Sequence, residues 1–263
     1  MHVFELTQLG NWLEGIADVD ESRELEALLR LLVSCIDDAA ISLALFEAAH
    51  SAPFEHRDQA QWETERQQEA HIRSRLESEL PAGLSVEERW AADRRMDELA
   101  RIEAKRERWR AGEIPSSYTH RLPFIHARTF LYALDSLQKS LGLIAKKPTA
   151  PAGVAIALAS FETEFPTLRH VRDSAHHVED RVQGRQFGKP ISLQPVENAF
   201  ISAPAGGALI IDALLNNRYG GTLWDGSYGE VEVSPKSAAV ATEIVQKVLD
   251  SFSWRGSPSH SPS

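Results

Sequence analysis

The chain has one cysteine, two methionines and no long apolar run among its 263 residues. Because Cys35 has no second cysteine to pair with, an intramolecular disulfide is excluded, and we expect a reducing compartment. No stretch approaches the roughly 20 apolar residues that a membrane-spanning helix requires. The first residues, Met1–Glu5, lack the basic and then apolar pattern of a signal peptide. The sequence therefore predicts a cytoplasmic protein with no membrane association.

An excess of basic residues is also missing. The chain carries 38 acidic and 28 basic side chains, which gives a formal net charge of −10. Such a chain has no global attraction for a polyphosphate, so broad, sequence-independent nucleic-acid binding is excluded. A local basic groove built where two chains meet is still compatible with this charge.

Two common catalytic loops are absent from the sequence. The glycine-containing segments 203–207 and 219–221 lack the lysine and the strand-to-helix context of a phosphate-binding loop, and we expect turns there. No nucleophile elbow of a serine hydrolase is present either.

Helical periodicity is what the sequence does contain. Apolar residues at helical spacing predict helices near 22–49, 123–145 and 152–182. Pro166 must kink the last of these or begin its second half. Between the first two, residues 58–112 are rich in Glu, Arg, Gln and Ala, with a capping box at 85–88 and only a narrow apolar stripe. They predict a long charged helical hairpin, which offers a surface for a protein partner.

The carboxy-terminal part has a different character. Short β-prone runs separated by Gly, Asn and Asp turns predict a small antiparallel β segment near residues 198–234. Ser234 followed by Pro235 is typical of the first turn of a last helix. We expect disorder in the Ser- and Pro-rich tail 256–263.

These patterns together predict a mainly α protein. A helical bundle that includes the charged hairpin would occupy residues 1–185. The β segment and the terminal helix, residues 186–255, would pack on that bundle.

The densest group of ionisable residues lies in the segment 168–182. On an ideal helix its apolar residues share one face that would pack into the bundle: Leu168, Val171, Ala175, Val178 and Val182. Arg172 and His177 would point roughly 140° apart on the same helix. One helix cannot bring both to a single substrate atom, so we expect a homodimer in which a second copy supplies the complement across a two-fold axis.

Arg172 and His177 suit the cleavage of a phosphodiester without a metal ion. A histidine transfers protons near neutral pH, and an arginine holds a phosphate and stabilises the charge that develops on it. RNA supplies its own nucleophile, the 2′-hydroxyl. The alternative from the same residues is a polar helix face joined by hydrogen bonds and ion pairs.

The same residues resemble the motif of the HEPN superfamily (higher eukaryotes and prokaryotes nucleotide-binding domains). That motif is an arginine, four to six intervening residues and a histidine, often with Asn, Asp or His directly after the arginine. Arg172 and His177 fit it with four intervening residues and Asp173 after the arginine, and Arg169 with His176 fit it with six. The resemblance covers residues 120–185 and, more loosely, 20–50.

The resemblance implies a four- or five-helix domain that dimerises and pairs two motifs in a cleft. Many such proteins are metal-independent ribonucleases of toxin–antitoxin, phage-defence or RNA-processing systems. It implies Arg172 and His177 as the catalytic pair, with Asp173 as the orienting residue, and no cofactor. The neighbouring ionisable residues are then candidates for substrate binding: Arg169, His176 and Arg181.

Other functions are compatible with this segment. His170, Asp173 and His177 lie at i, i+3 and i+7, and His176 and Asp180 at i and i+4, so either group would offer metal ligands. A di-metal bundle site would also need Glu-x-x-His motifs on neighbouring helices, which we do not find. A non-catalytic interaction module and a nucleotide-binding protein are the remaining alternatives.

Overall fold

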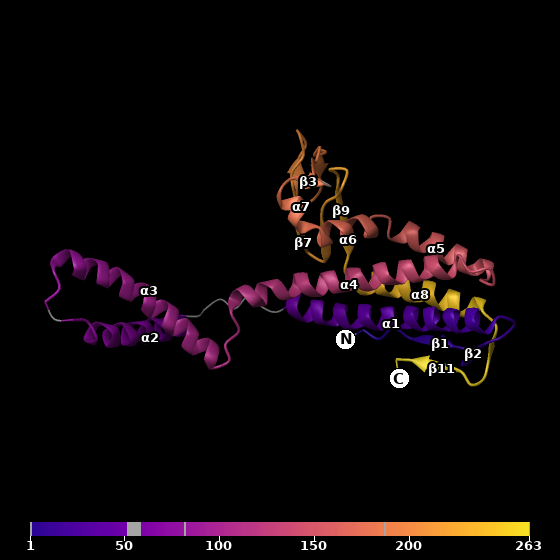
Figure 1. The fold of residues 1–263 in the computed structure, drawn as a ribbon, viewed down its shortest axis with the longest axis horizontal. Coiled ribbons are helices and arrows are strands. Elements are labelled where there is room, and N and C mark those ends of the chain that lie inside the picture. Colours follow the sequence, from indigo (N-terminus) through magenta and orange to yellow (C-terminus); the bar gives the residue numbers. More distant parts are fainter. Residues whose placement is uncertain (1, 52–58, 82, 187, 263) are drawn as a thin grey trace. The chain divides into compact units, whose positions relative to one another are not determined.

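The computed structural model describes residues 2–51, 59–81, 83–186 and 188–262 (Figure 1). They fall into two compact units, one made of residues 1–50 and 121–263 and the other of residues 51–120. The expected boundary near residue 185 therefore lies within the first unit. The prediction of a mainly helical protein with small antiparallel sheets in its carboxy-terminal part is confirmed.

Long helices form the body of the first unit. They are α1 (Val19–His50), α4 (Ser116–Ile144), α5 (Ala152–Glu164) and α8 (Pro235–Ser251). Figure 1 shows α1, α4 and α8 running alongside one another. Their apolar faces meet in one core of almost fully buried side chains, among them Leu25, Leu32, Leu43, Phe130, Leu134, Leu141, Phe161, Val245 and Val248. Burial of these side chains is the main force that holds the unit together.

Local sequence signals set two boundaries in this bundle. The Ser234 hydroxyl accepts a hydrogen bond from the backbone N–H of Ser237, and Pro235 follows in the first turn, as predicted for α8. Helix α4 begins seven residues before the expected start at Pro123, which lies inside it. Residues on both sides of this proline are helical, so it did not mark the beginning of the helix.

The region 152–182 is not one helix. Pro166 lies between α5 and α6 (Leu168–His176), and His177 separates α6 from α7 (Val178–Val182) with φ −107° and ψ 47°, outside the helical range. The predicted single apolar face was therefore wrong in its second half. Leu168 and Val171 are buried, whereas Val178 is 37% and Val182 64% exposed.

Three antiparallel strands form the largest sheet, in the order β7 (Ala213–Leu215), β8 (Arg218–Thr222), β9 (Tyr228–Glu232). Asn216, at φ +54°, is in the left-handed region that a tight hairpin turn requires, which an asparagine adopts readily. Helix α6 contacts both β8 and β9. Two shorter pairs precede this sheet in the sequence: β3 (Arg185–Gln186) with β4 (Lys189–Pro190), and β5 (Val196–Glu197) with β6 (Ser202–Ala203).

Within the expected β segment, the β-prone runs 198–202 and 208–211 are not strands in the structure, except for Ser202, which begins β6. In the run 198–202, the side chain of Asn198 accepts hydrogen bonds from the backbone of Phe200 and Ile201 and closes a turn. In the run 208–211, Ile210 forms hydrogen bonds with Thr222 of β8 but does not belong to a strand of the sheet. Both runs are apolar, and their composition did not distinguish a strand from a turn or loop.

The tail is more ordered than its composition suggests. Strand β11 (Ser259–Ser261) pairs with β1 (Leu6–Gln8), and β10 (Trp254–Arg255) pairs with β2 (Trp12–Leu13). The Gln246 side chain of α8 bonds both the N–H and the C=O of Thr7, and Leu6 is buried in the core. The tail makes its backbone hydrogen bonds to β1, which lies near the other end of the sequence. The expectation of disorder rested on composition, which does not reveal such a distant partner.

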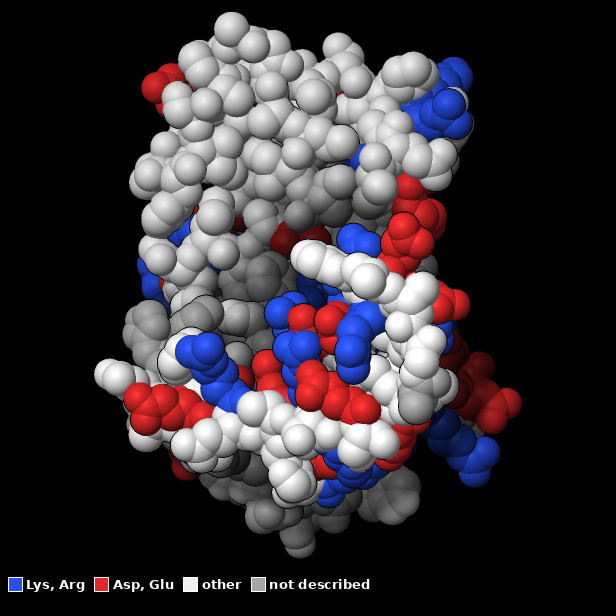
Figure 2. Space-filling view, turned by 90° about the vertical axis from the view of Figure 1, so that its left-hand side faces the viewer, with Lys and Arg blue, Asp and Glu red and all other residues white. Residues whose placement is uncertain are grey.

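The second unit contains α2 (Gln59–Ser78) and α3 (Val86–Arg110), packed against each other. Its core is small: Ile72, Ala100 and Ala104, with Leu76 beside them. Ser85 and Glu88 form the predicted capping box at the start of α3. Arginines pair with acids within and between these helices, such as Arg75 with Glu103 at 2.6 Å. Figure 2 shows basic and acidic side chains interspersed on the face drawn.

None of the described helices combines the length and the apolar content that crossing a bilayer demands.

Removal of residues 257–263 should expose β1 to solvent, because β11 is its pairing partner. We expect faster hydrogen exchange at the backbone amides of residues 6–8, measured by mass spectrometry on the intact chain and on the truncated one. The core helix α4 should exchange at the same rate in both. Unchanged protection at residues 6–8 would show that Gln246 and burial of Leu6 alone hold β1 in place.

Candidate functional site

Helix α6 carries the residues that the sequence singled out, and its first turn is anchored on the sheet. The Thr167 hydroxyl donates a hydrogen bond of 2.7 Å to the backbone carbonyl of Glu230 in β9. Leu168 and Val171 are buried in the core. These contacts fix the rotation of α6 about its axis, and Arg172 then reaches a carboxylate on α4.

Two carboxylates hold Arg172. Its Nε lies 3.1 Å from Oδ1 of Asp135 on α4, and its Nη1 lies 2.7 Å from Oδ1 of Asp173. The side chain of Asp135 is only 6% exposed, and its second oxygen, Oδ2, is 2.6 Å from Nζ of Lys139. Arg172 is itself largely buried, with 17% of its side chain exposed. The guanidinium therefore has a fixed position in the structure.

His176 and His177 lie at the end of α6 and are exposed. Their rings are perpendicular, with centroids 5.0 Å apart. Nδ1 of His177 is 3.6 Å from Oε1 of Glu179, and about half of the His177 side chain is open to solvent. Because the helix breaks at His177, the orientation of this ring differs from the one that a continuous helix would impose. Both imidazoles are accessible to a ligand and to water.

The other predicted site residues are placed less favourably for a common site. Among the described residues, no hydrogen bond or ion pair joins Arg172 to His177. Arg169 is exposed on α6. Arg181 is buried, with Nε 3.4 Å from the Ser174 hydroxyl and Nη1 donating to the carbonyl of Arg185 at 3.0 Å. These contacts give Arg181 a bracing position between α6, α7 and β3.

The alternative metal ligands do not come together. In the part of the chain that the structure describes, no three His, Cys, Asp or Glu side chains converge on a point that an ion would fill. The ring of His170 lies 6.0 Å from that of Trp224 instead, and Asp173 is engaged by Arg172.

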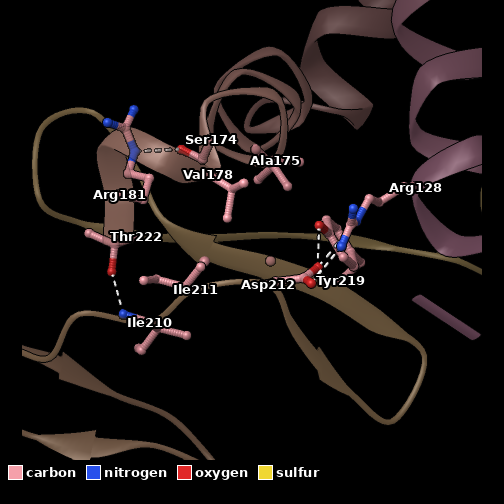
Figure 3. A pocket seen from close by; sticks show the side chains of 13 residues that line it. Arg128, Ser174, Ala175, Val178, Arg181, Ile210, Ile211, Asp212, Tyr219 and Thr222 are labelled. Atoms are coloured by element: carbon pink, nitrogen blue, oxygen red, sulfur yellow. Dashed lines mark hydrogen bonds and ion pairs between the residues drawn. The ribbon is translucent and has the colours of Figure 1, made fainter. Parts of the chain in front are cut away.

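A second polar cluster, which sequence reasoning missed, centres on Asp212. Its carboxylate accepts hydrogen bonds from the Tyr219 hydroxyl (2.7 Å) and from Arg128 on α4 (Figure 3), and also from Arg121 (3.0 Å) on the same helix. Burial alone would raise the pKa of Asp212, but these three donors outweigh it and hold the pKa below its ordinary value. Asp212 has φ +52°, a backbone conformation that costs energy for a non-glycine residue.

The Asp212 cluster borders a small cavity of about 20 Å³ between α6 and β8. Arg128, Ser174, Arg181 and Thr222 contribute polar side chains to its lining. A cavity of this size holds about one water molecule, so it cannot take a nucleotide. It lies at the junction of α4, α6 and the sheet.

A larger cleft of about 660 Å³ lies between the α5–α6 connection, β5, β9 and the start of α8. The size is in the range of small-molecule sites. Its lining carries two cationic side chains, Arg218 and Lys236, against four carboxylates: Glu164, Glu197, Glu230 and Glu232. Arg218 is already paired with Glu230 at 2.8 Å and Glu232 at 3.3 Å. The excess of negative charge makes this cleft unfavourable for a phosphate.

Sequence comparison adds no relative to this geometry: no family model, no curated protein and no solved structure matches the chain. The candidate site therefore rests on its residues alone.

Asp212→Ala should lower the free energy of unfolding of the first unit by about 3–5 kcal/mol, because it leaves the buried Tyr219 and the largely buried Arg128 without their acceptor. Asp212→Asn should cost less, since asparagine tolerates a positive φ and keeps one acceptor oxygen. Urea denaturation followed by circular dichroism measures both.

The contribution of Asp212 also sets a pH dependence. Its folded pKa is depressed, so the stabilisation is complete above the unfolded pKa of about 3.9 and is lost as the pH falls through the folded value. In Asp212→Asn this component of acid destabilisation should be absent. Identical acid profiles for the two proteins would contradict the role given to the carboxylate.

Proposed function

We propose that the protein is a HEPN-like, metal-independent endoribonuclease whose site is formed by Arg172 and His177. The observation that supports this best is a largely buried arginine held in place by two carboxylates, on a short helix that ends at the exposed His176 and is followed by the exposed His177. A fixed guanidinium and accessible imidazoles are what charge stabilisation and proton transfer on a phosphodiester require.

In this reaction the 2′-hydroxyl of RNA attacks the adjacent phosphorus, and the 5′-oxygen of the next nucleotide leaves. His177 takes the proton of the attacking hydroxyl or gives one to the leaving oxygen. Arg172 binds the non-bridging oxygens, on which negative charge grows in the transition state. No residue of the protein is needed as nucleophile.

A second copy of the chain completes the proposed site. Within one chain no hydrogen bond or ion pair joins Arg172 to His177, and His177 stands at an exposed break between α6 and α7. Two copies with facing α6 helices would place the histidine of one opposite the arginine of the other. Such a cleft would also concentrate basic groups locally in a chain of net charge −10. A cytoplasmic toxin–antitoxin or phage-defence system is the setting that the resemblance implies.

The second candidate function is a non-catalytic interaction module. Two observations favour it. Arg172 is already engaged by Asp135 and Asp173, as in an ion-pair network that only braces two helices. In the second unit, Trp62, Trp90 and Trp109 are exposed among alternating charges, a surface suited to a protein partner.

His177→Ala should reduce cleavage of a single-stranded RNA oligonucleotide by about 10²–10⁴-fold if His177 transfers a proton in the transition state. Because the side chain is half exposed, the melting temperature should change little. The matched control is His170→Ala, whose ring packs near Trp224. Equal loss of activity in both variants would contradict a specific role for His177.

Arg172→Lys should lower activity by about 10²–10³-fold, because an ammonium lacks the planar fork that binds two phosphate oxygens. The assay is the same, with circular dichroism to confirm folding. Activity of the unaltered protein should persist in EDTA. If Arg172→Lys unfolds the first unit while the RNA is never cleaved, the interaction module becomes the better account.

A further inference from the structure

Building on this proposed function, we propose that Asp135, and not Asp173, is the residue that positions Arg172, and that Asp173 occupies the edge of the guanidinium which the phosphate must take. The resemblance implied the orienting role for Asp173, which directly follows the arginine. The structure assigns a carboxylate to each edge of the same guanidinium, and the two differ in burial, in origin and in the nitrogen they contact.

Burial separates the two carboxylates. Asp135 belongs to the long helix α4 and its side chain is 6% exposed, whereas the side chain of Asp173 is 36% exposed. A buried carboxylate on a packed helix has one position and cannot be replaced by water without a large cost. A partly exposed ion pair between adjacent residues is weak and easily exchanged for water or another anion. Asp135 is therefore suited to hold Arg172, and Asp173 to leave it.

The nitrogens that the two carboxylates contact support the same assignment of roles to Asp135 and Asp173. Asp135 lies beside Nε, the inner nitrogen, and Asp173 beside Nη1, a terminal one. Phosphate and carboxylate ligands are bound by parallel N–H donors along an edge of the guanidinium. With Asp135 on the inner side, the terminal nitrogens are the ones left to face a ligand. Asp173 covers one of them.

The Nε–H of Arg172 indicates that the guanidinium can gain a hydrogen bond by a small rotation within its site. This nitrogen is buried and has no hydrogen bond, although Oδ1 of Asp135 is only 3.1 Å away, so the N–H is not aligned with the oxygen. A buried donor without an acceptor is costly, and a small rotation that aligns it with Asp135 is favourable. The same rotation moves Nη1 relative to Asp173. Release of Asp173 and tighter binding to Asp135 thus accompany each other.

Release of Asp173 makes the local net charge more positive, which favours binding of a phosphate. Asp135 pairs with both Lys139 and Arg172, and Asp173 brings the group of four to neutrality. When Asp173 turns to solvent, Asp135 with its two cations carries one net positive charge. That charge faces an arriving phosphate in a site from which water is partly excluded.

The test compares Asp135→Asn with Asp173→Asn on cleavage of a single-stranded RNA oligonucleotide. We expect Asp135→Asn to lower kcat about 10–100-fold, the loss that a displaced catalytic group causes. Asp173→Asn should lower KM about two- to five-fold without lowering kcat, because it removes a weak competitor. Glu24→Gln, which removes the acid of the exposed pair with Lys147, is the matched control and should change neither constant. A fall of kcat in Asp173→Asn equal to that in Asp135→Asn would overturn the proposal.

Folding and positioning are separated by a second variant and a second readout. Asp135→Glu keeps the charge and should recover part of the kcat lost in Asp135→Asn, and it replaces the latter if the asparagine variant unfolds. The Nε–H resonance of Arg172, identified by its disappearance in Arg172→Lys, should shift and broaden in Asp135→Asn but stay sharp in Asp173→Asn. The opposite pattern would refute Asp135 as the positioning residue. If the unaltered protein cleaves no RNA, the ribonuclease proposal fails, and this resonance still decides which carboxylate holds Arg172.

Discussion

The attachment of the β7–β8–β9 sheet to α4 through Asp212 is the constraint on which the candidate site depends. Asp212 accepts from Tyr219 within the sheet and from Arg121 and Arg128 on α4, so one carboxylate joins two layers. Helix α6 packs at this junction, with Thr167 hydrogen-bonded to β9 and Val171 in the core. Arg172 reaches Asp135 only because α6 is held against α4. The strained backbone of Asp212 is tolerated because three donors compensate for it.

Charge distribution decides where a polyanion would approach this molecule. The chain is acidic overall, the 660 Å³ cleft of the first unit carries four carboxylates against two cationic side chains, and α2 and α3 mix both signs. Three cationic side chains lie around α6. Arg169 and Arg172 belong to the helix, and Lys139 pairs with Asp135, as Arg172 does. The carboxylates of Asp135 and Asp173 offset their positive charge. A phosphate site here depends on which carboxylate leaves, since screened exposed pairs exchange readily and buried ones do not.

The ion pair of Arg172 with Asp135 has both a structural and a functional interpretation. A buried pair between two helices costs desolvation energy and is weak evidence for stability by itself. Its value is the fixed geometry it gives to a charged group, and fixed geometry is also what catalysis requires. The exposed histidines at the helix end take no part in the ion pairs of Arg172, and only the functional interpretation gives them a role.

Local signals in the sequence determined the long helices, the capping box at Ser85 and the start of α8 at Ser234, because each depends on spacing within a few residues. The segment carrying Arg172 and His177 was likewise visible as a cluster of ionisable residues. Only the tertiary structure decided that the helix breaks at His177, that Asp135 holds Arg172 and that the tail pairs with β1. Asp135 is 37 residues from Arg172, Arg128 is 84 from Asp212, and β11 lies at the far end of the chain from β1. Such contacts arise from packing between distant segments, which no local pattern of residues encodes.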